Sequence, residues 1–116
     1  MQFFTFDRAE RLIARYASTG AHATRVATGG EDGAVHLTCL TIEPGGAIGT
    51  HPAPCDQLFL VIAGEGWVSG PDGVPHPITA GTGVLWSAGE QHTSGSDTGL
   101  TALALEGAGL TVYEPS

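Results

Sequence analysis

Two stretches of the chain decide its fold: GGAIGTHPAPCDQLFLVIAG, residues 45–64, and GTGVLWSAGEQHTSGS, residues 81–96. Each stretch begins with a glycine and carries one histidine, His51 in the first and His92 in the second. Residues 57–63 form a predicted strand within the first stretch, of which 58–63 are apolar, and side chains along a strand alternate between two faces. We expect both faces of this strand to be buried. One would line a pocket, and the other would pack against a second sheet or a partner subunit.

Glycine-containing turns divide the rest of the chain into short apolar and β-branched segments. Turns are predicted at residues 29–33, 44–46, 64–66, 70–73 and 96–99. Strands are predicted over residues 23–28, 34–43, 57–63, 66–69, 77–79, 83–86, 101–106 and 110–114. Several short strands at this spacing predict an all-β barrel or sandwich.

A short helix is predicted only near the N-terminus, over residues 7–17. Asp7 can cap it, and Glu10 follows three positions later as in a capping box. Leu12, Ile13 and Tyr16 would then fall on one face of the helix.

The two stretches also share a register. The first reads Gly45-x5-His51-x-Ala53-x3-Gln57-x6-Gly64, and the second reads Gly81-x5-Ser87-x-Gly89-x2-His92-x3-Ser96. These resemble the two motifs of the cupin superfamily, G-x5-H-x-H-x3-E-x6-G and G-x5-P-x-G-x2-H-x3-N, and the resemblance covers about residues 34–106. It implies one domain over residues 1–116, a single cupin-type barrel (a double-stranded β-helix, or jelly roll) with its core at about residues 23–114. An immunoglobulin-like sandwich is the alternative fold.

The resemblance also implies a site. Metal-binding cupins usually supply three histidines and a glutamate, but here two of those positions hold Ala53 and Gln57. The implied ligands of a divalent transition metal (Zn, Fe, Ni or Mn) are therefore His51, Gln57 and His92, and the loss of two ligands makes binding weak or absent. Cys55 would add a thiolate if the chain stayed extended from His51, and the alternative for Cys55 is a small buried thiol.

The net charge of the chain limits the classes of ligand and partner that it can bind. The 116 residues include four arginines, no lysine and twelve acidic residues, for a net charge of −8. The arginines are Arg8, Arg11, Arg15 and Arg25, so residues 26–116 hold no fixed positive side chain. An acidic chain repels nucleic acid and anionic lipid, and we therefore expect a small, neutral organic ligand.

The remaining sequence features concern location and assembly. Two cysteines, Cys39 and Cys55, are too few for a disulfide framework, and the first residues do not read as a secretion signal, so we expect a cytoplasmic protein. The apolar run 58–63 is too short to span a bilayer. Its face formed by Leu58, Leu60 and Ile62 predicts a homodimer.

Three functions remain open at this stage. The first is a metal-dependent enzyme of the oxygenase or isomerase type. The second is a metal-free pocket in which His51 and His92 are catalytic, as acid and base, or only hydrogen-bond a neutral organic ligand. The third is a non-catalytic ligand-binding or interaction module. The residues leave open whether the chain is an enzyme, and they name no substrate.

Overall fold

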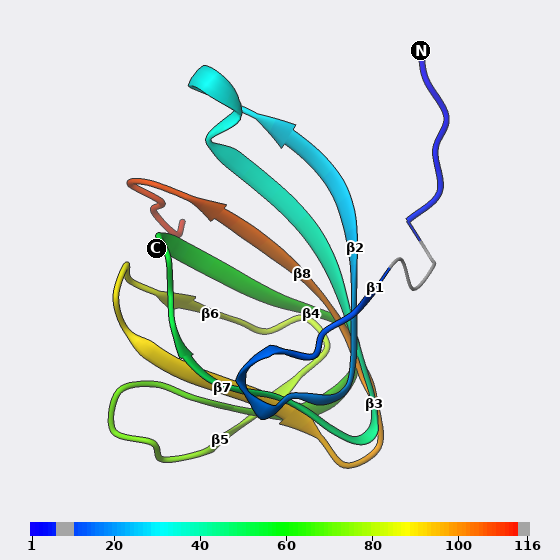
Figure 1. Cartoon of the computed structure of the whole chain (residues 1–116), viewed down its shortest axis with the longest axis vertical. Coiled ribbons are helices and arrows are strands. Elements are labelled where there is room, and N and C mark those ends of the chain that lie inside the picture. Colours follow the sequence, from blue (N-terminus) through cyan, green and yellow to red (C-terminus); the bar gives the residue numbers. More distant parts are fainter. Residues whose placement is uncertain (7–10, 114–116) are drawn as a thin grey trace.

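The fold is described from a computed structural model, in which residues 1–6 and 11–113 are described. Eight strands and two 3₁₀ turns follow one another along this part of the chain (Figure 1). They are β1 (Arg11–Leu12), η1 (Arg15–Ala17), β2 (Thr19–Gly29), η2 (Glu31–Gly33), β3 (Val35–Pro52), β4 (Asp56–Ser69), β5 (His76–Thr79), β6 (Gly83–Trp86), β7 (Gln91–Ser96) and β8 (Leu100–Gly107). The predicted all-β class is confirmed.

The barrel closes because β3 and β4 are long strands that each take part in two layers. The first half of β3 pairs with β2 and β8, and its second half pairs with β7. In the same way β4 pairs first with β8 and β6, and then with β5 and β7. All of these pairs are antiparallel. The two layers face each other, as Figure 1 shows.

The long strands explain why two predicted turns are absent. Residues 44–46 lie within β3 and residues 64–66 lie within β4. Gly64 has φ +78°, and a Cβ at this position would collide with the backbone at Gly99 and Leu100. Glycine therefore lets β4 bend from one layer to the next, where the sequence pattern indicates a turn.

Three other expectations need correction. The predicted helix is wrong over residues 11–17, which form β1 and η1, while residues 7–10 lie outside the described residues. Tyr16 and Ala17 have positive φ, and Ile13 donates its backbone N–H to Ala21 of β2 instead of forming a helical bond. The strand predicted over residues 110–114 does not form over 110–113, and residue 114 lies outside the described residues. The sequence pattern did not predict β7, because its inward residues are polar.

The interior between the layers is small and apolar. Inward-facing residues of β2, β3, β4, β5, β6 and β8 form the core, together with Ala53 between β3 and β4. The buried members are Ala21, Ala23, Leu40, Ile42, Ile48, Ala53, Phe59, Val61, Val68, Ile78, Trp86, Leu100, Ala102 and Ala104. No described segment forms a helix long and apolar enough to cross a membrane.

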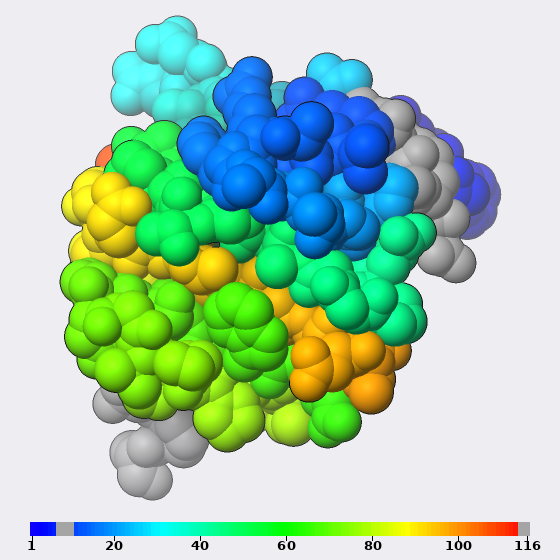
Figure 2. All heavy atoms as spheres, turned by 60° about the horizontal axis from the view of Figure 1, so that its bottom comes forward, coloured from blue at the N-terminus to red at the C-terminus, as the bar shows by residue number. Residues whose placement is uncertain are grey.

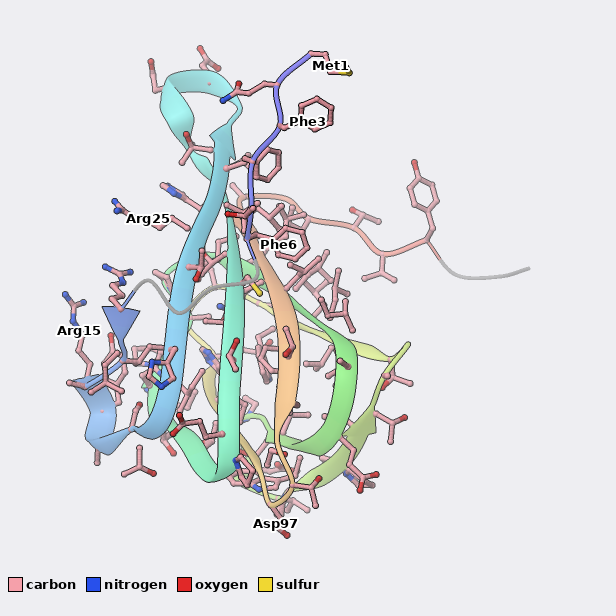
Figure 3. All side chains as sticks on the ribbon, turned by 90° about the vertical axis from the view of Figure 1, so that its right-hand side faces the viewer. Met1, Phe3, Phe6, Arg15, Arg25 and Asp97 are labelled. Carbon is pink, nitrogen blue, oxygen red and sulfur yellow. The ribbon has the colours of Figure 1, made fainter. Side chains whose placement is uncertain are left out.

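The outer face of the sheet is only half covered, so the expectation that both faces of β4 are buried is wrong for the single chain. Leu60 is 38% exposed and Ile62 is 46% exposed. One outer row of in-register neighbours consists entirely of half-buried leucines: Leu37, Leu105, Leu58 and Leu85. Phe3 and Phe6, labelled in Figure 3, are exposed on the N-terminal segment. The chain thus presents an apolar outer surface.

Candidate functional site

The centre of the site is a pair of histidines on neighbouring strands. His51 of β3 and His92 of β7 are direct cross-strand partners. Their ring centroids lie 4.2 Å apart with the planes tilted by 56°. His92 is 3% exposed and His51 is half-buried. The motif spacing thus places the two rings together as expected, while their catalytic and metal-binding roles stay predictions.

Both rings are tied to the backbone through the same nitrogen. His51 Nδ1 lies 2.7 Å from the carbonyl oxygen of Gly49, and His92 Nδ1 lies 3.1 Å from that of Glu90. A carbonyl oxygen only accepts, so each Nδ1 carries the hydrogen and donates it. In the neutral ring the lone pair is then on Nε2. Each histidine is thereby oriented and left with one unused acceptor.

The environment keeps His92 neutral. Burial lowers the pKa of His92 below its usual 6.5, and the neighbouring His51 lowers it further. The hydrogen bond to the Glu90 carbonyl and the Glu90 carboxylate oppose this shift without cancelling it. At neutral pH, His92 therefore presents a lone pair rather than a positive charge.

The histidines belong to a column of five aromatic rings that runs from the surface into the core. Tyr16 stacks on His51 at 4.2 Å with the planes only 7° apart, and Trp86 stacks on His92 at 4.3 Å. Phe59 continues the column, 5.7 Å from Trp86. The stacked neighbours restrain the two imidazole rings in addition to the backbone hydrogen bonds.

The outer end of this column comes from a segment that we call the N-terminal strap, residues 11–18. Gly49 donates its backbone N–H to Ser18 Oγ at 3.0 Å, and a Cβ on Gly49 would collide with the carbonyl of Tyr16. Glycine at this position therefore lets the strap lie against β3. Figure 2 shows the strap in blue across one end of the molecule, next to the green atoms of β3. Sequence reasoning missed this role because it assigned Tyr16 to a helix.

Gln57 is the third residue of the predicted set, and it lies on the same inner face of β4 as Phe59. It is 7% exposed, and its cross-strand partners are Trp86 on β6 and Glu106 on β8. Gln57 Nε2 donates to Glu106 Oε1 at 2.9 Å. Gln57 Oε1 is buried and has no hydrogen-bond partner among the described residues. A buried acceptor without a partner costs about 1–3 kcal/mol, so this oxygen is expected to serve a ligand.

Glu106 is the residue of the site that sequence reasoning did not anticipate. It follows Ala102 and Ala104 at every second position of β8, which places it on the inner face. The signal for Glu106 in the sequence was an acidic residue at an inward-facing position of a strand. The barrel thus contains a carboxylate near the usual glutamate position, but on a different strand.

The surroundings of Cys55 favour its protonated, neutral form. Burial raises the pKa of the Cys55 thiol, and the carboxylates of Glu106 and Asp56 raise it further, against a weaker opposing hydrogen bond from Gly107. In the absence of a metal the thiol is therefore protonated at neutral pH, and a role as a metal ligand stays a prediction.

The donor set is incomplete for a resident divalent ion. Within residues 1–6 and 11–113, no three or more His, Cys, Asp and Glu side chains gather as a metal-binding group. The predicted ligands His51, Gln57 and His92 provide two nitrogens and one neutral amide oxygen, and Ala53 contributes none. The carboxylate of Glu106 is already bonded to Gln57. An ion held there would need water or a ligand to complete its shell.

Two open hollows flank the loop that begins at Gly70. One, of about 440 Å³, reaches Trp86 and Glu90 and so borders the residues around His92. The other, of about 480 Å³, lies around Trp67, Thr50 and Thr93, on the side of the sheet away from the histidines. Neither hollow is lined by His51, Gln57 or His92. Tyr16 and Trp86 each stack on one of the two imidazole rings.

The described cations lie away from the site. Arg11, Arg15 and Arg25 are all exposed. In Figure 3, Arg15 and Arg25 project from the outer side of β1 and β2. The charge near the site therefore comes from carboxylates, and an anionic ligand would find no described arginine beside it.

Comparison with known proteins agrees with this architecture. No family model and no curated protein matches the sequence. Among solved structures, a cupin-like protein from Thermotoga maritima is similar over 90% of this chain and 81% of its own, with TM-score 0.77 and 18% identity. The polyketide cyclase RemF from Streptomyces resistomycificus covers 91% of this chain and 78% of its own length, with TM-score 0.76 and 18% identity.

A Cupin 2 conserved barrel domain protein from Salinispora arenicola is similar over 94% of this chain and 90% of its own, with TM-score 0.73 and 19% identity. Identities this low establish the architecture and not the activity. The chain therefore has the fold of a small cupin barrel.

Proposed function

We propose that the barrel binds a small, neutral organic molecule at His51, His92 and Gln57. The observation that carries this proposal is the buried Oε1 of Gln57, which has no hydrogen-bond partner. The two imidazoles add an Nε2 lone pair each, because their Nδ1 atoms are committed to backbone carbonyls. Three acceptors of this kind bind a molecule that carries hydroxyl or N–H groups.

The same arrangement is suited to acid–base chemistry. A neutral Nε2 can take a proton from a bound hydroxyl or activated C–H, and the imidazolium formed in this way can return that proton to another position of the ligand. This is the proton movement of an isomerisation or a cyclisation. A polyketide cyclase among the proteins of similar fold is in keeping with an organic substrate. Binding without turnover would use the same contacts.

A divalent transition metal held by His51, Gln57 and His92 is the second candidate. The observation in its favour is that both imidazoles donate Nδ1–H to a carbonyl, the arrangement commonly found around metal-binding histidines. Against it stands the incomplete donor set. The candidate ions are Zn, Fe, Ni and Mn.

The two candidates are separated by elemental analysis and a fragment screen on protein purified without a metal-affinity tag. For the organic ligand, we expect substoichiometric metal and small polar fragments that shift the ring signals of His51 and His92 in nitrogen-detected NMR. His92→Ala should abolish these shifts, and His22→Ala, on β2 beside Glu43 and outside both hollows, should not. Fragments that bind only around Trp67 would contradict the proposal, and stoichiometric metal would favour the second candidate.

A further inference from the structure

The side-chain amide of Gln57 has two possible orientations, related by exchange of its oxygen and nitrogen, and the carboxylate of Glu106 determines which one forms. Gln57 of β4 and Glu106 of β8 are in-register partners, and Gln57 Nε2 donates to Glu106 Oε1 at 2.9 Å. Turning the amide over would bring two oxygens together without a hydrogen between them. Glu106 therefore holds the NH₂ end of Gln57 and leaves the carbonyl end without a partner inside the barrel.

We propose that Glu106 sets the hydrogen-bonding polarity of the site, so that the barrel selects ligands that present a donor and rejects analogues that present only an acceptor. This inference rests on the proposed small-molecule site and goes further, because it names the ligand class: neutral alcohols, phenols and molecules with N–H groups. Glu106 acts here as a positioning residue. It does not need to contact the ligand.

The rest of the site favours the same class. His51 and His92 each use Nδ1–H on a backbone carbonyl and keep Nε2 as an acceptor. Asp56 and Glu106 are the carboxylates next to Cys55, and the described arginines are exposed on other surfaces. A ligand that offers only acceptors would leave Gln57 Oε1 unpaired, and a buried polar group left unpaired usually costs about tenfold or more in affinity.

Phenol and anisole are suitable probes, since they differ by one methyl group that removes the donor. In ¹⁵N-labelled protein, phenol should shift the side-chain amide of Gln57 and the ring of His92, with a dissociation constant at least about tenfold below that of anisole. In Glu106→Gln the amide of Gln57 is free to turn, and the preference should fall to within about threefold. Asp56→Asn is the matched control, because it removes a neighbouring carboxylate and leaves the carboxylate of Glu106, which accepts the hydrogen bond from Gln57.

Gln57→Met provides a second variant, which keeps the length of the side chain and removes the acceptor. It should lose the preference for phenol, so the inference stays testable if Glu106→Gln does not fold. Anisole binding as tightly as phenol in the native protein would overturn the inference and leave the site itself intact. An undiminished preference in Gln57→Met or Glu106→Gln would also overturn it. If neither probe shifts Gln57 or His92 at millimolar concentration, the proposed function fails and the inference fails with it.

Discussion

The contact between Gln57 and Glu106 predicts how Gln57→Glu will behave. The substitution is nearly isosteric, and it places a carboxylate oxygen where Nε2 now lies, 2.9 Å from Glu106 Oε1. Two unit charges with centres about 4 Å apart repel by about 4 kcal/mol at an effective dielectric constant of about 20. The variant can avoid this repulsion only by taking up a proton or by binding a cation.

The free energy of protonating one of the two carboxyl groups limits the loss of stability in Gln57→Glu. Keeping one carboxyl protonated at pH 7 costs about 1.4 kcal/mol for each pH unit above the ordinary glutamate pKa of about 4.3, or about 3.7 kcal/mol. Glu106 is partly exposed, so solvent reduces the repulsion, and we expect a loss of about 2–3 kcal/mol. For a domain of this size the melting temperature should fall by about 10 °C at pH 7.

The pH dependence of the loss identifies its cause. The introduced carboxyl has a raised pKa in the folded state, so above about pH 4.3 the folded state holds a proton that the unfolded chain has released. The free energy of unfolding of the variant should therefore fall, relative to the native protein, as the pH rises from about 4.3 towards 7. At pH 5 about 1 kcal/mol of the loss should remain. Thermal melts in buffers between these values measure the difference.

A charge-exchange variant is the matched control. Gln57→Glu combined with Glu106→Gln restores one amide and one carboxylate at the contact, and it should recover most of the stability at pH 7. If Gln57→Glu alone melts within about 2 °C of the native protein at both pH 5 and pH 7, the two side chains are not in contact and the reasoning is refuted.

Four further predictions follow from the site and the outer surface. Burial lowers the pKa of His92, so the ring in the folded protein should titrate below 6.5 by NMR. The free energy of unfolding should therefore decrease as the pH falls below 6.5, because the unfolded chain then binds the proton more readily. Titration of His92 at or above 6.5 would contradict this prediction. Tyr16→Ala should cost about 0.5–1.5 kcal/mol of stability and speed the acylation of His51 by diethyl pyrocarbonate, because the ring that stacks on His51 is lost. Tyr16→Phe keeps the ring and should change neither quantity. Equal acylation rates in all three proteins would show that the strap does not cover His51. We expect a homodimer by light scattering at tens of micromolar and a monomer for Leu60→Asp; a monomeric native protein would reject the outer surface as an interface. In calorimetry with Zn²⁺, Ni²⁺ and Mn²⁺, affinity should rise from the native protein to Gln57→Glu or Ala53→His and again to the double variant, and failure of the double variant to bind any ion would remove the metal positions.

The resemblance of the two motif spacings to those of cupins predicted both the barrel fold and the proximity of the two histidines. In the structure, His51 and His92 lie opposite each other on the paired strands β3 and β7. The resemblance predicted Gln57 as a site residue, and alternation along β4 puts Gln57 on one face with Phe59, which the structure shows to be the inner face.

The rest of the site depends on contacts between distant segments. Tyr16 reaches His51 only because β1 pairs with β2 and because Gly49 has no Cβ, and neither fact is visible in the residues around position 16. Those residues have a helical pattern, which tertiary contacts override. Glu106 lies beyond both motifs, and its partner is fixed by the pairing of β8 with β4. Strand pairing at this distance along the chain does not follow from local propensity.

The five-ring column has a consequence for the order of folding. Its rings come from the strap, β3, β7, β6 and β4, so no two consecutive elements of the chain suffice to build it. Contacts between residues far apart in sequence form slowly, because a long loop must close before any of them is made. The histidine pair should therefore assemble late, after the individual hairpins. A partly folded chain would have strands but no site, and ring-current shifts of the two imidazoles would mark the moment at which the two layers close.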